Sequence, residues 1–180
     1  MERTPARASS PFALDAGLGA IHSFGGVGPA VLPLFGVSYR LDERLALHLR
    51  FGGPAFTTTL EASAGSIAVH QALGWMELAF RPIVPAGPIS PAVLLGAGGY
   101  HVDVAGTADA PYRGATAQRF SAMLAFGPAV AVTLGPRVSL VAAAELLFVA
   151  PKPVIRAAGE AIASIGRPSL LGGLTVDVGF

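Results

Sequence analysis

Two long stretches of the chain contain no Asp, Glu, Lys or Arg, but glycines and prolines interrupt both of them. Residues 16–39 contain six glycines and two prolines, and residues 82–102 contain four prolines. A proline in a helix interior costs about 3 kcal/mol, and a glycine costs about 1 kcal/mol relative to alanine. Backbone groups freed by such breaks find no water inside a bilayer. Neither stretch can therefore cross a membrane as a helix.

The composition nevertheless indicates a membrane protein. Hydrophobic residues make up 52% of the 180 residues and charged residues only 13%, and the mean hydropathy is +0.60. Soluble domains carry about 25% charged residues. Apart from a helix, a closed β-barrel is the structure that satisfies every backbone group in lipid. The sequence therefore predicts an all-β fold.

The charged and metal-binding residues exclude several function classes. The net charge is +1 and there is no cysteine, so a basic surface for nucleic acid and thiol chemistry are both excluded. The four histidines do not stand at the spacing of zinc ligands. Glycine-rich pieces such as 96–99 do not lead from a strand into a helix, as a nucleotide loop requires. We expect no metal and no cofactor.

Segments with strand character recur along the chain with alternating short and long connections. The connections 41–44, 82–89 and 135–137 are short or rich in proline and glycine, whereas 53–66, 105–117 and 150–168 are long and polar. This pattern predicts an eight-stranded antiparallel up-and-down transmembrane β-barrel with both termini on one side. In loop 150–168, residues 154–165 could form a short helical excursion, although a solvated loop is expected. The eight segments are 12–24, 30–40, 45–52, 67–81, 90–104, 118–134, 138–149 and 169–180.

Alternation within the segments separates a lipid face from a lumen face. In 45–52, Leu47 and Leu49 share one face while His48 and Arg50 share the other. A lipid-facing Arg or Lys costs about 2–4 kcal/mol at the bilayer midplane, so the charged face is expected inside. The same phase places His101, Asp103 and Arg119 in the lumen. The expected lumen network is Asp15, Arg40, His48, Arg50, Glu77, Arg81, Glu145 and Asp177.

The lumen residues are expected to form salt bridges that fill the barrel, because eight strands leave an interior just wide enough for side chains. An open pore or a proton path is the alternative. A tight loop near residues 26–28 would pair residues of the first two segments whose numbers sum to about 55. Asp15 and Arg40 meet that condition, and Asp177 should approach Arg40 from the last segment. These three residues form the expected buried ion cluster.

Aromatic residues lie near the ends of the segments on the proposed lipid face, as in the interface belts of membrane proteins. Most are phenylalanines. The belt at the short-turn end consists of Phe12, Tyr39, Phe80 and Phe180, and the belt at the long-loop end consists of Phe24, Phe51, Tyr100, Phe120 and Phe148.

Over residues 12–180 the chain resembles the small eight-stranded outer-membrane barrels of Gram-negative bacteria, the OmpA/OmpX type. Its last residues look like the terminal insertion signal of that class, with alternating apolar residues before a C-terminal phenylalanine: Leu174, Val176, Val178 and Phe180. The resemblance implies insertion by the outer-membrane assembly machinery and contact with outer-membrane lipid. Nothing follows Phe180, so a peptidoglycan-binding domain is not implied. We expect a monomer with a structural or surface-interaction role.

Two other functions remain open. A lipid A-modifying enzyme would need a serine near a histidine base; the candidates are His22 beside Ser23, His70 near Ser66, and His101 with Asp103, and we expect no catalytic residues. A soluble lipocalin-like barrel would need an apolar interior. Residues 1–11 lack the apolar core of a secretion signal. We therefore expect a mature form whose signal has been removed, with a disordered segment 1–11 followed by a barrel domain 12–180.

Overall fold

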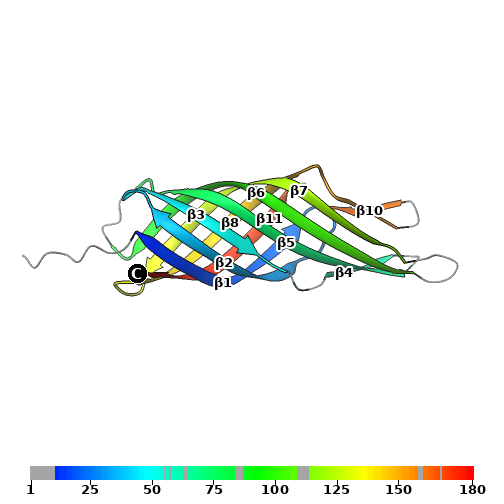
Figure 1. Cartoon of the computed structure of the whole chain (residues 1–180), viewed down its shortest axis with the longest axis horizontal. Helices are drawn as coiled ribbons and strands as arrows, with labels where there is room; N and C mark the ends of the chain where they lie inside the picture. Colours follow the sequence, from blue (N-terminus) through cyan, green and yellow to red (C-terminus); the bar gives the residue numbers. More distant parts are fainter. Residues whose placement is uncertain are drawn as a thin grey trace, which may run out of the picture.

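The computed structural model describes residues 11–54, 56, 58–62, 65–83, 87–108, 114–157, 160–166 and 168–180, and its elements are all β-strands (Figure 1). Among these residues no helix is long and apolar enough to span a membrane. The expected disordered segment 1–11 lies outside the described residues except for Pro11. The strands are β1 (Phe12–Ser23), β2 (Ala30–Arg40), β3 (Leu45–Gly52), β4 (Thr58–Ala62), β5 (Gly65–Phe80), β6 (Ile89–Ala108), β7 (Thr116–Thr133), β8 (Val138–Ala150), β9 (Val154–Ala157), β10 (Glu160–Ser164) and β11 (Ser169–Gly179).

Eight of these strands close into an antiparallel barrel. Each pairs with the next in the order β1, β2, β3, β5, β6, β7, β8 and β11, and β11 pairs back with β1. The eight barrel strands coincide with the eight predicted segments, so the predicted fold class is confirmed. The reason is that each strand carries its own period-two pattern, which does not depend on its neighbours.

The β1–β2 hairpin has a different register from the one predicted. Phe12 pairs with Tyr39 and Ile21 pairs with Ala30, so paired residue numbers sum to 51 instead of 55. The turn occurs about two residues earlier because Gly26, with a φ of +101°, donates its N–H to the Ser23 carbonyl. The Asp15–Arg40 pairing is therefore wrong.

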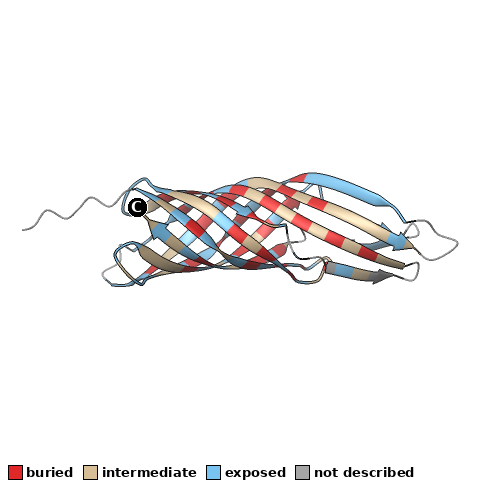
Figure 2. Cartoon of the chain, turned by 60° about the horizontal axis from the view of Figure 1, so that its bottom comes forward, coloured by how far each residue is buried: buried red, intermediate tan, exposed pale blue. Residues whose placement is uncertain are grey.

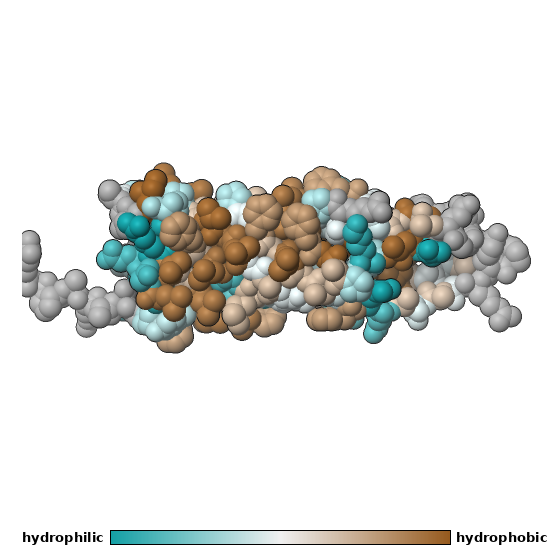
Figure 3. Space-filling model, turned by 90° about the horizontal axis from the view of Figure 1, so that it is seen from above, coloured by the Kyte–Doolittle hydropathy of each residue, from teal (hydrophilic) through white to brown (hydrophobic). Residues whose placement is uncertain are grey.

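The outer surface of the barrel carries a broad apolar band, which is visible in Figure 3. Figure 2 shows buried and exposed positions alternating along the strands that form this surface. In β3, Leu47, Leu49 and Phe51 are 37%, 39% and 53% exposed, whereas His48 and Arg50 are 8% and 4% exposed. The leucine face meets lipid because the charged face would cost several kcal/mol there.

Three strands extend well beyond the barrel at the long-loop end (Figure 1). β5 loses its pairing with β3 beyond Leu73, and β7 loses its pairing with β8 beyond Ala122. β5, β6 and β7 nevertheless stay paired with one another, and β4 adds to the outer edge of β5. Much of what was predicted as loops 53–66 and 105–117 is therefore sheet. We call β4 together with residues 65–72, 101–108 and 116–121 the surface sheet.

The long connection between β8 and β11 forms the hairpin β9–β10, which projects from the barrel mouth at the long-loop end (Figure 1). Ile155 of β9 and Ala163 of β10 are only 4% and 7% exposed, and Ile165, which follows β10, is fully buried. Neither the helical excursion nor the solvated loop considered for residues 154–165 is found. A hairpin forms because its inward residues complete the apolar core of the lumen.

The interior of the barrel is apolar at the long-loop end and polar toward the short-turn end. The apolar part includes Leu32, Leu73, Met123, Leu147 and Leu171, each at most 6% exposed. The expectation of a polar lumen therefore holds only for part of its length. The interior at the long-loop end contains apolar side chains, to which the hairpin contributes. An unpaired charge buried among them would raise the free energy of the folded state.

Candidate functional site

The most charged part of the interior is a cluster around Arg50 of β3. The Arg50 Nε lies 3.6 Å from Asp15 Oδ1, and its Nη1 lies 3.2 Å from Glu77 Oε1 and 3.9 Å from Glu145 Oε1. All four residues are at most 6% exposed. The three carboxylates come from β1, β5 and β8, so one guanidinium links strands from across the lumen. A planar guanidinium with five donors suits this role.

Glu77 has two further neighbours in the cluster. The Trp75 Nε1–H donates a hydrogen bond of 3.0 Å to Glu77 Oε2. His48 Nδ1 lies 3.6 Å from Glu77 Oε1, and His48 and Glu77 are directly opposed in the β3–β5 register. The cluster therefore has three carboxyl groups around one guanidinium, with an indole and an imidazole completing it. We call Asp15, His48, Arg50, Trp75, Glu77 and Glu145 the central cluster.

Two glycines make room for these side chains. Asp15, Gly36 and Arg50 lie in one cross-strand row, so the Asp15 side chain reaches its cation across Gly36. A Cβ at Gly36 would lie 2.3 Å from Asp15 Oδ2, and a Cβ at Gly96 would lie 2.9 Å from the Glu77 Cβ. The absence of side chains at these two positions allows the carboxylates to point inward. Glycine inside a strand often marks such a close approach.

Arg40 and Arg81 do not belong to the central cluster. Both line a cavity of about 210 Å³ at the short-turn mouth, together with Arg137, Asp177 and His48. The prediction that Asp15 flanks Arg40 is therefore wrong, because Arg50 is the cation next to Asp15. Asp177 does share the cavity with Arg40, and it lies opposite Asp15 in the β1–β11 register. The expected network is divided between the two places because Arg40 is the last residue of β2, beyond the buried row. We call this cavity the mouth pocket.

The predicted aromatic belts consist of exposed rings with one exception. The residues Phe12, Tyr39, Phe80, Phe180, Phe24, Phe51, Phe120 and Phe148 are between 39% and 70% exposed. Tyr100 is fully buried, and its hydroxyl donates a hydrogen bond to Gln71 Oε1. Its place in the belt is therefore a wrong prediction. The run of glycines before Tyr100 gave no contrast between the faces, so the phase of β6 could not be read there.

The histidines considered for catalysis lie apart from their serines. His22 is exposed while Ser23 is buried and donates to the Ser164 carbonyl. Ser66 lies four residues from His70 on the same strand, about 13 Å away. His101 and Asp103 point out of the barrel, because their neighbours Tyr100 and Val102 are buried. Their placement in the lumen was wrong for the same reason as that of Tyr100. The described residues bring together no Ser–His pair from this set.

The side chains of Leu174, Val176, Val178 and Phe180 lie on the lipid face at the end of the chain. They are 52%, 43%, 39% and 56% exposed. β11 is paired on both sides, with β1 and with β8, so this segment closes the barrel. Its role as an insertion signal stays a prediction. The charged residue at the lumen side of this segment, Asp177, has an Oδ1 without a hydrogen-bond partner among the described residues.

Sequence reasoning missed two parts of the interior. Arg137, in the turn between β7 and β8, was not included among the lumen residues, although it lines the mouth pocket. The plug formed by Ile155 and Ile165 was assigned to a solvated loop. For the plug no alternation of apolar and polar residues gave a signal, since Val154 and Ile155 are adjacent and both apolar. Arg137 lies in a turn of three residues, where side chains do not alternate between two faces. The direction of its side chain could therefore not be inferred from the sequence.

Solved structures share this fold. Neisserial surface protein A superposes with a TM-score of 0.59 at 16% identity, covering 97% of this chain and 100% of that chain. A major outer membrane protein from Thermus thermophilus gives 0.62 at 15% identity, covering 93% and 99%. Ail, the attachment invasion locus protein of Yersinia pestis, gives 0.55 at 13% identity, covering 95% and 99%. No protein-family model matches the sequence, and no curated protein matches it significantly.

These likenesses confirm the resemblance to the small eight-stranded outer-membrane barrels at the level of the fold. At such low identity the residues of the central cluster and of the mouth pocket are not carried over from any of them. Their roles depend on the geometry of this chain.

Proposed function

We propose that this protein is an outer-membrane barrel without an open pore that acts through the surface sheet at its long-loop end. The single observation that carries the proposal is the plug: the connection between β8 and β11 packs its inward apolar residues against the lumen core at the barrel mouth. Ile155, Ala163 and Ile165 pack with the apolar lumen residues in one buried cluster. This arrangement leaves the outer face of the protein as its means of contact with other molecules.

Backbone and side-chain hydrogen bonds attach the plug to the barrel. The Ser164 N–H donates to the Gly25 carbonyl at 2.8 Å, and the Ser23 hydroxyl donates to the Ser164 carbonyl at 3.1 Å. A Cβ at Gly25 would lie 2.0 Å from that Ser164 carbonyl oxygen, so the close contact requires glycine. These contacts support a plug that remains in place.

The central cluster supports a second closed layer below the plug. Arg50 lies within 3.9 Å of carboxylates from three strands, so its guanidinium and their side chains occupy the middle of the lumen. An eight-stranded barrel has an interior that side chains can fill. The two layers together support a barrel with a structural and surface-interaction role instead of a conducting one.

Planar bilayer recordings test the absence of a pore. The wild-type protein should give no steady single-channel conductance. A variant with residues 154–165 replaced by a flexible linker and with Arg50→Ala and Glu77→Ala should conduct, because both layers are removed. A steady conductance of the wild-type protein, equal to that of this variant, would contradict the proposal.

Complementation of a strain lacking the protein tests the role of the surface sheet. A trimmed variant, in which a two-residue turn replaces residues 103–118, keeps the pairings of the barrel and shortens the sheet. The wild-type gene should restore both the barrier to vancomycin and any adhesion defect, whereas the trimmed variant should restore only the barrier. Full restoration of adhesion by the trimmed variant would contradict a role of the surface sheet.

A further inference from the structure

The mouth pocket combines three arginines with a single acidic side chain. Arg40 ends β2, Arg81 follows β5, and Arg137 lies in the turn between β7 and β8, so three separate elements bring positive charge to one cavity. Asp177 is the acidic residue of the lining. The lining therefore contains more guanidinium groups than carboxylates.

The three arginines are not used by the ion pairs of the barrel. Among the described residues, the ion pairs join Arg50 to the carboxylates of the central cluster. Burial lowers the pKa of the Arg81 guanidinium, and the positive charge of Arg40 lowers it further, while Asp177 raises it. Arg40 and Arg81 therefore repel each other. An anion between them would relieve this repulsion.

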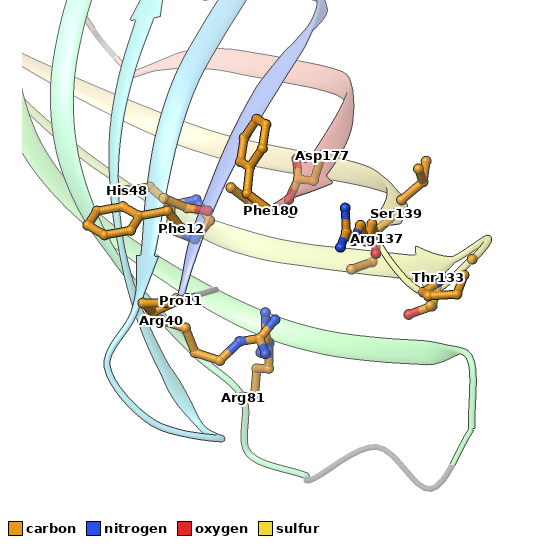
Figure 4. A pocket seen from close by; sticks show the side chains of 18 residues that line it. Pro11, Phe12, Arg40, His48, Arg81, Thr133, Arg137, Ser139, Asp177 and Phe180 are labelled. Carbon is orange, nitrogen blue, oxygen red and sulfur yellow. The ribbon is translucent and has the colours of Figure 1, made fainter. Parts of the chain in front are cut away.

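The side chains point into the cavity. Figure 4 shows Arg40 and Arg81 extending toward the same place, while Arg137 and Asp177 lie on the other side of the pocket. The floor contains His48, and the hydroxyl groups of Ser38 and Ser139 contribute further donors to the lining. Guanidinium groups match the tetrahedral oxygens of phosphate, with which they form bidentate, charge-assisted hydrogen bonds.

We propose that the mouth pocket is a binding site for a phosphate group, held between Arg40 and Arg81 with Arg137 at its rim. A phosphate monoester carries a charge of about −1.5 to −2 at pH 7 and three acceptor oxygens, so it can engage more than one guanidinium at once, whereas a carboxylate carries a single charge. The volume of about 210 Å³ accommodates a phosphate with a small organic substituent. In outer-membrane barrels the short turns face the periplasm, so the ligand enters from that side.

Two sources could supply this phosphate: a soluble periplasmic phosphomonoester or the headgroup of a phospholipid in the adjacent leaflet. The lining favours the soluble source, because Ala46, His48 and Ala131 face the lumen and a lipid would have to bend over the rim of the barrel. The experiment below separates the two sources.

Isothermal titration calorimetry with glycerol 3-phosphate, on the full chain in maltoside micelles that contain no phosphate, tests the site. Saturable binding is expected, and Arg81→Gln and Arg40→Gln should each weaken the Kd at least tenfold, since each removes charge-assisted hydrogen bonds. Arg44→Gln is the matched control: it removes the same charge from a turn at the same end of the barrel, but it does not line the pocket. Its Kd should equal that of the wild-type protein.

Further measurements distinguish the two sources of phosphate and test the site itself. Unchanged binding in phosphatidylcholine and phosphatidylglycerol nanodiscs supports the soluble source, and weakened binding in these nanodiscs relative to the micelles supports a site occupied by headgroup phosphate. No saturable binding in maltoside micelles, an equal loss in Arg44→Gln, or an equal affinity for acetate would overturn the phosphate site. Migration of each unheated variant as a folded barrel on a gel shows that a loss of binding is not a loss of fold; Arg40→Gln, at an exposed position, provides the second test if Arg81→Gln does not fold.

Discussion

At the scale of single residues, the interior depends on matching one cation to several carboxylates. Arg50 is 4% exposed and Glu77 only 1%, so without Arg50 the Glu77 carboxylate would be a buried charge that has lost its cation. Taking a charge out of water costs several kcal/mol, and the ion pair recovers that cost only while its partner is present. Removing one member of the central cluster is therefore expected to destabilise the barrel, because it leaves a buried charge without its partner.

We predict that Arg50→Met lowers the free energy of unfolding by about 3–5 kcal/mol, because it leaves buried carboxylates without their cation. Adding Glu77→Gln should recover part of this loss. The measurement is urea unfolding in lipid vesicles, followed by tryptophan fluorescence of Trp75. Arg44→Met, at an exposed turn, should have little effect. Additive losses in the double variant would contradict a direct interaction between Arg50 and Glu77.

A second residue-scale prediction concerns Gly36. Gly36→Ala should destabilise the barrel, because the new Cβ would lie 2.3 Å from Asp15 Oδ2 and would displace that carboxylate. In an Asp15→Ala background the same substitution should cost less, since the conflicting atoms are gone. Gly172→Ala is the control, because a Cβ there meets no atom within 4 Å. The same unfolding assay applies, and equal costs of Gly36→Ala in both backgrounds would rule out this steric account.

At the scale of elements, β11 has two roles that can be separated. It closes the barrel through pairings with β1 and β8, and its outer face presents Leu174, Val176, Val178 and Phe180 to lipid. Pairing concerns the backbone, whereas recognition by an assembly machinery would concern the terminal side chains. The Phe180 backbone N–H also donates to the Phe12 carbonyl at 3.3 Å.

We predict that deleting Phe180 impairs assembly in cells far more than refolding into detergent micelles. Refolding needs only the barrel pairings, most of which remain, whereas assembly in cells would lose the recognised residue. The fraction of folded protein in outer-membrane preparations and in micelles measures the two effects. Phe12→Ala is a suitable control, because Phe12 is an exposed ring at the same end of the barrel. Similar losses in both assays would mean that Phe180 contributes only packing.

At the scale of the whole molecule, the barrel is organised along its axis. The apolar band surrounds it, the surface sheet projects from one end, and the mouth pocket opens at the other (Figures 1 and 3). Exposed large apolar residues on every barrel strand mean that water is a poor solvent for the folded form. When lipid or detergent covers these apolar residues, they no longer contact water, and the folded form is stabilised.

We predict that the denatured chain gains β-sheet circular dichroism only when detergent or lipid is added. The folded form should also migrate differently in unheated and heated gel samples, since closed pairing of all barrel strands resists dissociation. An Ail preparation refolded in parallel provides a reference with the same fold. A monodisperse soluble monomer without detergent would contradict a transmembrane barrel.

The sequence by itself determined the number of barrel strands, their positions and most of the lipid face. These properties are local: a period of two and the cost of exposing Arg50 or Glu145 to lipid act within one strand. The inward direction of Arg50, His48 and Glu77 followed from the same argument. Where a strand offered no contrast between its faces, as in β6 before Tyr100, the same argument gave the wrong face.

Only the tertiary structure decided which charged residues meet and what closes the barrel. A turn two residues earlier than predicted moved Asp15 from Arg40 to the row of Gly36 and Arg50, because hairpin register depends on how the turn at Gly26 closes. The β9–β10 hairpin became a plug because the lumen offered its apolar residues a surface contributed by distant strands. The mouth pocket joins Arg40, Arg81 and Arg137 from three connections. Such contacts arise between segments far apart in the chain, and no local pattern encodes them.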